Sequence, residues 1–177
     1  MIVTKKILGW KVTYLKDLPK KSVLILYPHT SNLDFLISII AKSLTPIKTR
    51  ILVKSELSHP IINKLFNIVP VNRSQRSDMT AYLAQKLNQE AFSLAITPEG
   101  TRSYVSKWKR GFYYIALRAD VPIGLVHIDY KNKTYGVEKF IHPSGDLEKD
   151  FAKIKAYYQT KGHGLYPKHM GELNITK

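Results

Sequence analysis

The spacing of apolar residues along the chain predicts strands and helices in alternation. A run at Val23–Tyr27 has the β-branched and aromatic character of a buried strand. After a polar loop, five aliphatic residues recur at the three- and four-residue spacing of a helix: Leu33, Leu36, Ile37, Ile40 and Leu44. Ser31 or Asn32 stands where the start of this helix needs a capping side chain.

The same pattern continues through the rest of the chain. Further strands are predicted at residues 50–53, 69–72, 92–97, 122–128 and 135–141. Further helices are predicted at residues 59–66, 79–87, 111–119 and 146–158. This alternation is typical of an α/β fold in which a mainly parallel sheet is flanked by helices on both faces.

The length and the absence of repeats or linkers favour a single domain over residues 1–177. The chemically interesting motifs fall in a core at about residues 20–130. The stretch at about 162–177 is expected to be a weakly structured tail.

Composition narrows the class of partner. The chain has 28 Lys and Arg residues against 13 Asp and Glu, a formal net charge of +15. Such an excess predicts an anionic partner, which can be nucleic acid, a phosphorylated or coenzyme substrate, or an acidic membrane surface. The sequence contains no cysteine, which excludes disulfides, cysteine-ligated metal sites and a cysteine nucleophile.

No segment has the length and apolar character of a membrane span. The longest stretch without Asp, Glu, Lys or Arg is 22–33, well short of the roughly 20 apolar residues a spanning helix needs. The apolar stretch at the N-terminus is too short for a signal-peptide core. We therefore expect a cytoplasmic protein with no transmembrane helix and no signal peptide.

Two loops that follow predicted buried strands carry reactive side chains. The first holds His29 and Asp34, five residues apart across a strand-to-helix junction. An imidazole takes up a proton near neutral pH, and a carboxylate on its second nitrogen fixes the tautomer and stabilises the resulting cation. The spacing alone is a weak motif, so an ordinary loop histidine and an aspartate at a helix start stay open as an alternative.

The second loop is Thr97–Ser103, which offers a carboxylate, a glycine and an arginine. Glycine lets backbone amides approach a ligand, and the fork of Arg102 matches phosphate oxygens. Alone, this loop reads as a polar turn. Because ligands in open α/β sheets bind beyond the carboxyl ends of strands, the two loops together favour a site at that edge.

Four blocks, in order, resemble the glycerophospholipid acyltransferases, which include the 1-acylglycerol-3-phosphate acyltransferases. His29–Asp34 matches the family's His-x4-Asp block, and Lys54 through Arg73 resembles its second block. Pro98–Ser103 matches the third block almost letter for letter, and Val121–Ile123 resembles the fourth. The resemblance extends over about residues 20–130 and implies an acyltransferase-type α/β fold.

The resemblance implies that His29 is the general base on the acceptor hydroxyl and that Asp34 orients it. The residues implied to hold the acceptor's phosphate or headgroup are Arg73, Glu99, Gly100, Thr101 and Arg102. Cations implied to contact the donor's phosphates or the bilayer are Lys107, Lys109 and Arg110. The implied reaction moves a fatty acyl chain from an acyl-coenzyme A or acyl-carrier-protein thioester to a lysophosphatidic acid-like hydroxyl. It needs no acyl-enzyme, no bound cofactor and no metal.

Two alternatives remain open at this point. One is an acyltransferase for another acceptor, such as lyso-ornithine lipid or a different lysolipid. The other is a non-catalytic protein on the same scaffold that binds anionic lipid or nucleic acid, of which nucleic acid is the minor option. The basic N-terminal segment at residues 5–21 is expected either to lie on the inner membrane face, as in a peripheral membrane protein, or to be a solvated strand edge. His163 and His169 are expected at the tail surface, and His127 and Asp129 as structural or site-lining groups.

Overall fold

The fold is seen in a computed structural model that describes residues 1–54, 67–71 and 79–175. The strands are β1 (Ile2–Ile7), β2 (Trp10–Leu15), β3 (Ser22–Tyr27), β4 (Thr49–Lys54), β5 (Ile68–Val71), β6 (Ser93–Ile96), β7 (Ile123–Asp129) and β8 (Thr134–Ile141). The helices are α1 (Leu33–Ser43), α3 (Met79–Gln89), α4 (Gly111–Ala119), α5 (Leu147–Tyr158) and the short 3-10 helix η3 (Pro167–His169).

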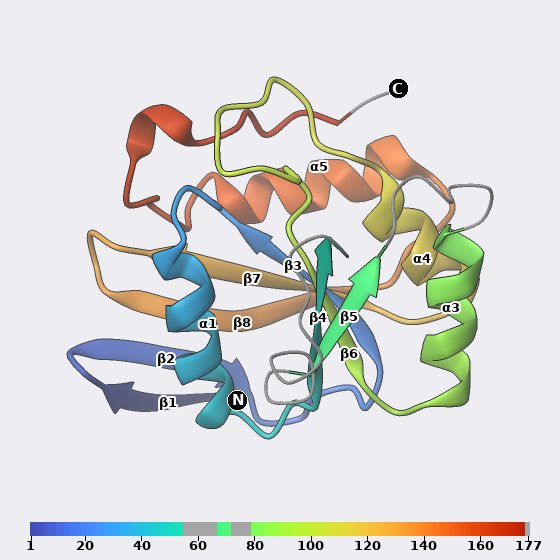
Figure 1. Ribbon diagram of the computed structural model, residues 1–177, viewed down its shortest axis with the longest axis horizontal. Helices are drawn as coiled ribbons and strands as arrows, with labels where there is room; N and C mark the ends of the chain where they lie inside the picture. The colour runs from blue at the N-terminus through green and yellow to red at the C-terminus, as the bar shows by residue number, and fades with distance from the viewer. Residues whose placement is uncertain (55–66, 72–78, 176–177) are drawn as a thin grey trace.

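These described strands form one sheet in the order β1-β2-β8-β7-β3-β6-β4-β5 (Figure 1). Neighbours pair in parallel from β7 through β3, β6 and β4 to β5, and β2 is parallel to β8. Only the β1–β2 and β7–β8 pairs are antiparallel among the strands of this sheet. The predicted mainly parallel α/β fold is confirmed, and β3, β6 and β7 all end at the same edge.

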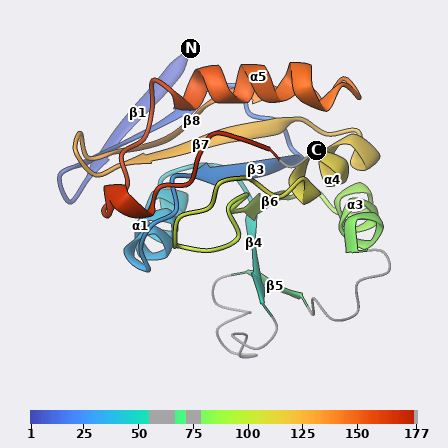
Figure 2. The ribbon, with the colours of Figure 1, turned by 90° about the horizontal axis from the view of Figure 1, so that it is seen from above.

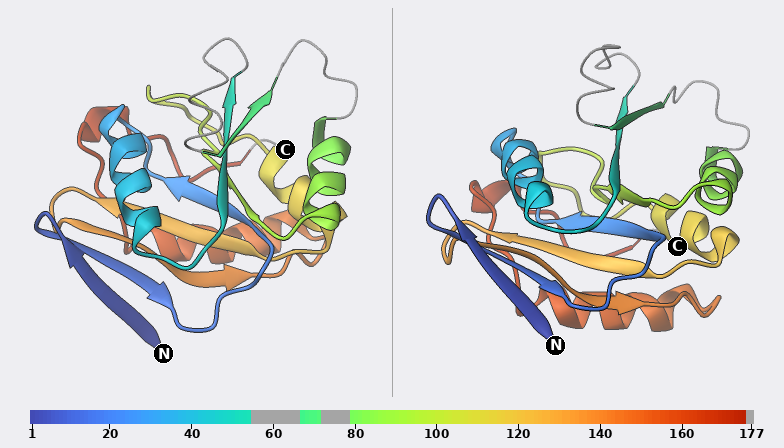
Figure 3. Two further views of the ribbon diagram at one scale, coloured as in Figure 1. Left: turned by 60° about the horizontal axis from the view of Figure 1, so that its bottom comes forward. Right: turned by 90° about the horizontal axis from the view of Figure 1, so that it is seen from below.

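Helices pack on both faces of the sheet (Figures 2 and 3). Val23, Ile25 and Tyr27 of β3 belong to the larger core, together with residues of α3, α4 and α5. The alternate residues Leu24 and Leu26 belong to the smaller core on the other face, where α1 lies. Such alternation is expected for a strand buried on both sides, and both β3 and β7, which lead into the site, are almost entirely buried.

Most predicted elements lie close to the observed ones, and helix α4 has the predicted bounds. Strand β5 begins at Ile68 rather than at residue 69, and the expected helix at 59–66 lies outside the described residues. The hairpin of β1 and β2 was expected only as a possible strand edge. Its first strand is largely exposed, so it has no buried alternation to reveal it in the sequence.

The stretch after α5 contains little regular structure, yet it is fixed to the rest of the molecule. One bridge joins His163 to Asp129 and another joins Ile175 to Trp108. Gly162 and Gly171 are buried. The segment at 162–175 therefore lies across the loops that follow β3 and β6.

None of the helices in the described part of the chain has both the length and the apolar character that a membrane span requires.

Candidate active site

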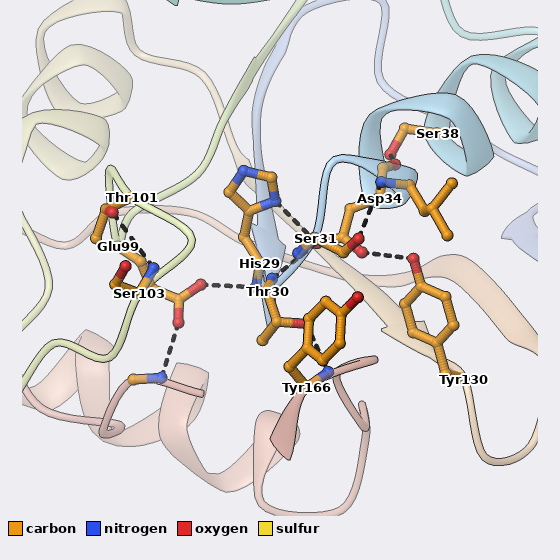
Figure 4. Close-up of polar contacts among 12 residues, drawn as sticks. His29, Thr30, Ser31, Asp34, Ser38, Glu99, Thr101, Ser103, Tyr130 and Tyr166 are labelled. Carbon is orange, nitrogen blue, oxygen red and sulfur yellow. Dashed lines mark hydrogen bonds and ion pairs between the residues drawn. The ribbon is translucent and has the colours of Figure 1, made fainter. Parts of the chain in front are cut away.

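The two predicted loops meet at the carboxyl ends of β3 and β6 (Figure 4). His29 Nδ1 lies 3.0 Å from Asp34 Oδ2, so the imidazole and the carboxylate are in hydrogen-bond contact. Asp34 is fully buried, whereas 18% of the His29 side chain is exposed. One ring nitrogen of His29 is thus held by Asp34, and the other, Nε2, points away from this contact (Figure 4).

Asp34 is held by more than its histidine. Its Oδ2 accepts hydrogen bonds from the amides of Thr30 at 2.8 Å and Ser31 at 2.9 Å, and its Oδ1 accepts one from the Tyr130 hydroxyl at 2.6 Å. Burial alone raises the pKa of Asp34, but the bonds from His29, Tyr130, Ser31 and Thr30 outweigh it and keep the pKa below its usual range. An ionised carboxylate in this position fixes the ring orientation and stabilises an imidazolium.

Of the two residues expected to cap α1, Ser31 bonds the first helical amide with its side chain and Asn32 does not. Asn32 occupies the cap position but makes no capping hydrogen bond with its side chain. Ser31 Oγ instead accepts a bond from the Leu33 amide at 3.1 Å. Asp34 lies in the first helical turn, where the partial positive charge of the helix N-terminus also favours its ionised form.

Glu99 belongs to the second loop and joins it to the first loop and to the segment at 162–175. Its Oε2 accepts a bond from the His29 amide at 2.7 Å, and its Oε1 accepts one from the Gly171 amide at 2.9 Å. Only 1% of Glu99 is exposed, and burial raises the pKa of its carboxyl to about 7, despite these two amide bonds. In this structure the carboxylate anchors the backbone of His29 and does not face solvent.

A cavity of about 660 Å³ opens beside His29. Its walls are mostly apolar side chains from the sheet, including Leu24, Leu26, Ile51, Ile96 and Val126. Gly100, Thr101 and Arg102 also line it, so three of the residues implied to bind the acceptor lie on the same cavity as the histidine. Gly100 has φ +69°, a left-handed conformation that suits glycine, and a Cβ there would lie 2.9 Å from Lys109 Nζ.

The basic residues that follow the Thr97–Ser103 loop lie in different surroundings. Lys109 lines a second cavity of about 230 Å³, which shares Thr97 and Gly100 with the first. Lys107 is exposed and lines neither cavity, and the guanidinium of Arg110 lies over the Tyr114 ring. Arg73 lies outside the described residues.

Sequence reasoning missed two groups that build the site. Tyr130 immediately follows β7, and its place at the same sheet edge as the two loops was a signal that could have found it. Gly171 contributes through its backbone amide, from a part of the chain with no strand or helix pattern. No signal in the sequence identifies such a contact.

A second histidine–aspartate pair lies at the end of β7. His163 Nδ1 is 2.8 Å from Asp129 Oδ2, and 52% of the His163 side chain is exposed. His127 is buried, and its Nδ1 contacts the Tyr157 hydroxyl at 2.9 Å. Within the described ranges, no group of three or more His, Cys, Asp or Glu side chains is placed to hold a metal ion.

Known proteins resemble this chain over much of its length. The family model described as Acyltransferase matches residues 9–128. An uncharacterized acyltransferase of Schizosaccharomyces pombe is 34% identical over 146 residues, which cover 76% of this chain and 50% of that protein. A probable 1-acyl-sn-glycerol-3-phosphate acyltransferase of Mycoplasma pneumoniae is 36% identical over 119 residues, which cover 61% of this chain and 44% of that protein.

The region that the family model matches contains both loops of the site. The chain spans about half the length of the curated relatives it matches. No solved structure matches it significantly.

Proposed function

The chain belongs to the acyltransferase family, and on that premise we propose that it moves a fatty acyl chain from a thioester to the hydroxyl of a lysophosphatidic acid-like lipid. The donor is an acyl-coenzyme A or an acyl-carrier protein. The observation that carries the proposal is the position of His29, which is held by a buried carboxylate and lines a large apolar cavity.

In the proposed reaction, His29 Nε2 takes the proton from the acceptor hydroxyl while the hydroxyl oxygen attacks the thioester carbonyl. A carbon–oxygen bond forms and the carbon–sulfur bond breaks. The proton then passes from the imidazolium to the departing thiolate. Asp34 stabilises the imidazolium, and no covalent intermediate with the protein is required.

The cavity supports an acyl chain as the transferred group. Its volume of about 660 Å³ lies within the ~300–1,000 Å³ typical of small-molecule sites. Aliphatic side chains of β3, β4, β6 and β7 line it, and each methylene that leaves water contributes about 0.8 kcal/mol to binding. The acyl chain of the donor would lie along the sheet, with the thioester carbonyl next to His29.

The acceptor's phosphate would lie at the mouth of this cavity, against the backbone of Gly100 and the side chains of Thr101 and Arg102. The name of the Mycoplasma relative supports a phosphate-bearing acceptor. Lys109, which reaches Gly100, is suited to the phosphates of the donor, and Lys107 and Arg110 extend the same basic stretch. The reaction as proposed uses no bound cofactor or metal.

We further infer that the protein meets its acceptor at an anionic membrane surface, as a peripheral protein. The net charge of +15 and the lipid nature of the substrate support this location. Binding to vesicles is then reversible, requires anionic lipid and weakens as salt rises, because salt screens surface charges.

The test is a screen of acceptors with purified protein. Acyl-coenzyme A and acyl-carrier protein are offered as donors to lysophosphatidic acid, lysophosphatidylcholine and lyso-ornithine lipid, and both thiol release and acylated product are measured. We expect product with lysophosphatidic acid and a loss of about a thousandfold in His29→Ala. Equal turnover by His29→Ala contradicts the mechanism. Product only with lyso-ornithine lipid overturns the acceptor and keeps the reaction.

A further inference from the structure

Helix α1 has three sides with different surroundings. Asp34 and Ala41 face the protein and are buried. Phe35, Ser38 and Lys42 line the large cavity. The third side carries five aliphatic residues at helical spacing: Leu33, Leu36, Ile37, Ile40 and Leu44. Leu33 is 48% exposed and Leu36 is 52% exposed, and the other three are partly exposed.

This outer side differs from the usual surface of a helix in a globular protein, which carries polar side chains toward water. Helix α5 of the same molecule shows the usual arrangement. Its buried residues are Asp150, Phe151, Ile154 and Tyr158, and its exposed positions include Glu148, Lys149, Lys153 and Lys155. The apolar outer side of α1 is therefore a local feature and calls for an apolar partner.

The hairpin of β1 and β2 runs alongside α1 and supplies positive charge. Near the start of the helix, the Trp10 ring packs edge-on against Tyr130, whose hydroxyl binds Asp34. Near its end, Lys5 Nζ donates a hydrogen bond to the Leu44 carbonyl at 2.8 Å.

At the hairpin tip, Lys6 and Lys11 are paired across the two strands, and Leu8 is 79% exposed. The tip therefore adds an exposed apolar side chain near the helix, while its two cations lie on the face of the hairpin opposite to Lys5.

We propose that the outer side of α1, with the adjoining hairpin, is the surface by which the protein docks on a phospholipid bilayer that contains anionic lipid. The aliphatic side chains enter the boundary between headgroups and acyl chains, and Lys5, on the face of the hairpin toward α1, contacts anionic headgroups. The docking helix also forms a wall of the large cavity. A lipid can then pass between bilayer and cavity without crossing water, a step that rests on the proposed function.

The test compares two double variants on surfaces of similar exposure. Leu33→Gln/Leu36→Gln removes two aliphatic groups from α1, and Tyr82→Gln/Leu117→Gln does the same on α3 and α4, where Tyr82 is 48% and Leu117 is 37% exposed. Sedimentation is measured with phosphatidylcholine vesicles, with and without phosphatidylglycerol. We expect the α1 variant to bind anionic vesicles about tenfold more weakly, with the control variant close to wild type.

A probe at single positions gives an independent measurement. Because the chain contains no cysteine, Leu36→Cys and Leu117→Cys can each be labelled with an environment-sensitive fluorophore. We expect a blue shift on vesicle addition only at position 36. Equal vesicle binding by both double variants, or no shift at position 36, overturns the proposal. Dimers that dissociate in the α1 variant also overturn it, since the surface is then an interface between copies.

A further assay measures acyl transfer from a short-chain thioester to a short-chain acceptor, neither of which forms vesicles. Because it needs no membrane, it distinguishes an effect on docking from an effect on the reaction. The α1 variant should retain that turnover while it loses vesicle binding. If no substrate is turned over but vesicle binding still depends on α1, the proposed function fails and the docking surface stands. Circular dichroism and thermal unfolding confirm that each variant is folded.

Discussion

Two histidine–aspartate pairs lie at the carboxyl ends of neighbouring strands, and their contacts are nearly the same. His29 and Asp34 are 3.0 Å apart, and His163 and Asp129 are 2.8 Å apart. Both aspartates are buried. In both, hydrogen bonds outweigh the effect of burial and lower the carboxyl pKa. Judged by this contact alone, either pair could activate a hydroxyl.

The surroundings distinguish the two pairs. His29 lines the large cavity, and its amide is anchored by Glu99. His163 is 52% exposed and lines neither cavity, and Asp129 also accepts bonds from Asn132, which follows in the β7–β8 turn. A histidine–aspartate contact therefore does not define the site. The site is defined by the apolar cavity and the anchored backbone next to the pair of His29 and Asp34.

The largest expected effect is the difference between alanine variants of the two histidines. His29→Ala removes the proposed base and should lower kcat/KM about a thousandfold, within the usual range for general acid–base catalysis. His163→Ala is the matched control and should stay within about twofold of wild type, as surface substitutions usually do. Steady-state thiol release measures both. A large loss in His163→Ala would show that the wrong pair has been assigned.

The aspartates give the second effect. Asp34→Asn removes the negative charge that stabilises the imidazolium and replaces one of two hydrogen-bonded carboxylate oxygens by an NH₂ group, so kcat should fall a few hundredfold. Asp129→Asn should leave kcat within about threefold, because that pair does not contact the cavity. Comparable losses in the two variants, at unchanged thermal stability, would contradict the distinction.

Glu99 gives the third effect, which depends on pH. Its folded-state pKa of about 7 is above the ordinary value near 4.5, so the native state binds the proton more tightly than the unfolded chain. The ionised form therefore destabilises the fold, and this contribution grows from about pH 4.5 and is complete above about pH 7, reaching about 3 kcal/mol.

Glu99→Gln removes that titration. The difference in free energy of unfolding between Glu99→Gln and wild type should shift in favour of the variant as pH rises through this window. Urea titrations at several pH values measure it. A difference that does not change with pH would mean that Glu99 is not the titrating group.

The smallest expected effect tests the hydrogen bond from Tyr130 to Asp34. Tyr130→Phe removes the 2.6 Å hydrogen bond to Asp34 Oδ1 and leaves the rest of the ring in place. We expect kcat to fall about tenfold with little change in KM, and the acidic limb of the pH–rate profile to move. Tyr157→Phe, which removes a hydroxyl bonded to His127, is the control and should leave that profile unchanged.

The sequence was most informative where burial is strong. Strand β3 and helix α4 were predicted well because their apolar residues face a core. The meeting of the His29 and Glu99 loops followed from the rule that parallel strands end at one edge. The inward orientation of Glu99 could not be predicted, because it depends on an amide at Gly171, 72 residues away.

The contact between His163 and Asp129 could not be predicted from the sequence either. Its partner Asp129 is 34 residues away, and nothing in the local pattern joins the two. The apolar outer side of α1 was visible in the sequence as five aliphatic residues at helical spacing. Helical spacing identifies a face of a helix and does not identify what covers it.

The contact between Glu99 and Gly171 also bears on when the site can form. The loops that hold His29 and Glu99 are synthesised well before residue 171, whose amide bonds Glu99. Contacts between distant parts of a chain are closed late in folding, since they carry the larger loop-closure entropy. A nascent chain can therefore build its central strands early, while the backbone of His29 acquires its anchor only when the segment at 162–175 has folded across the loops.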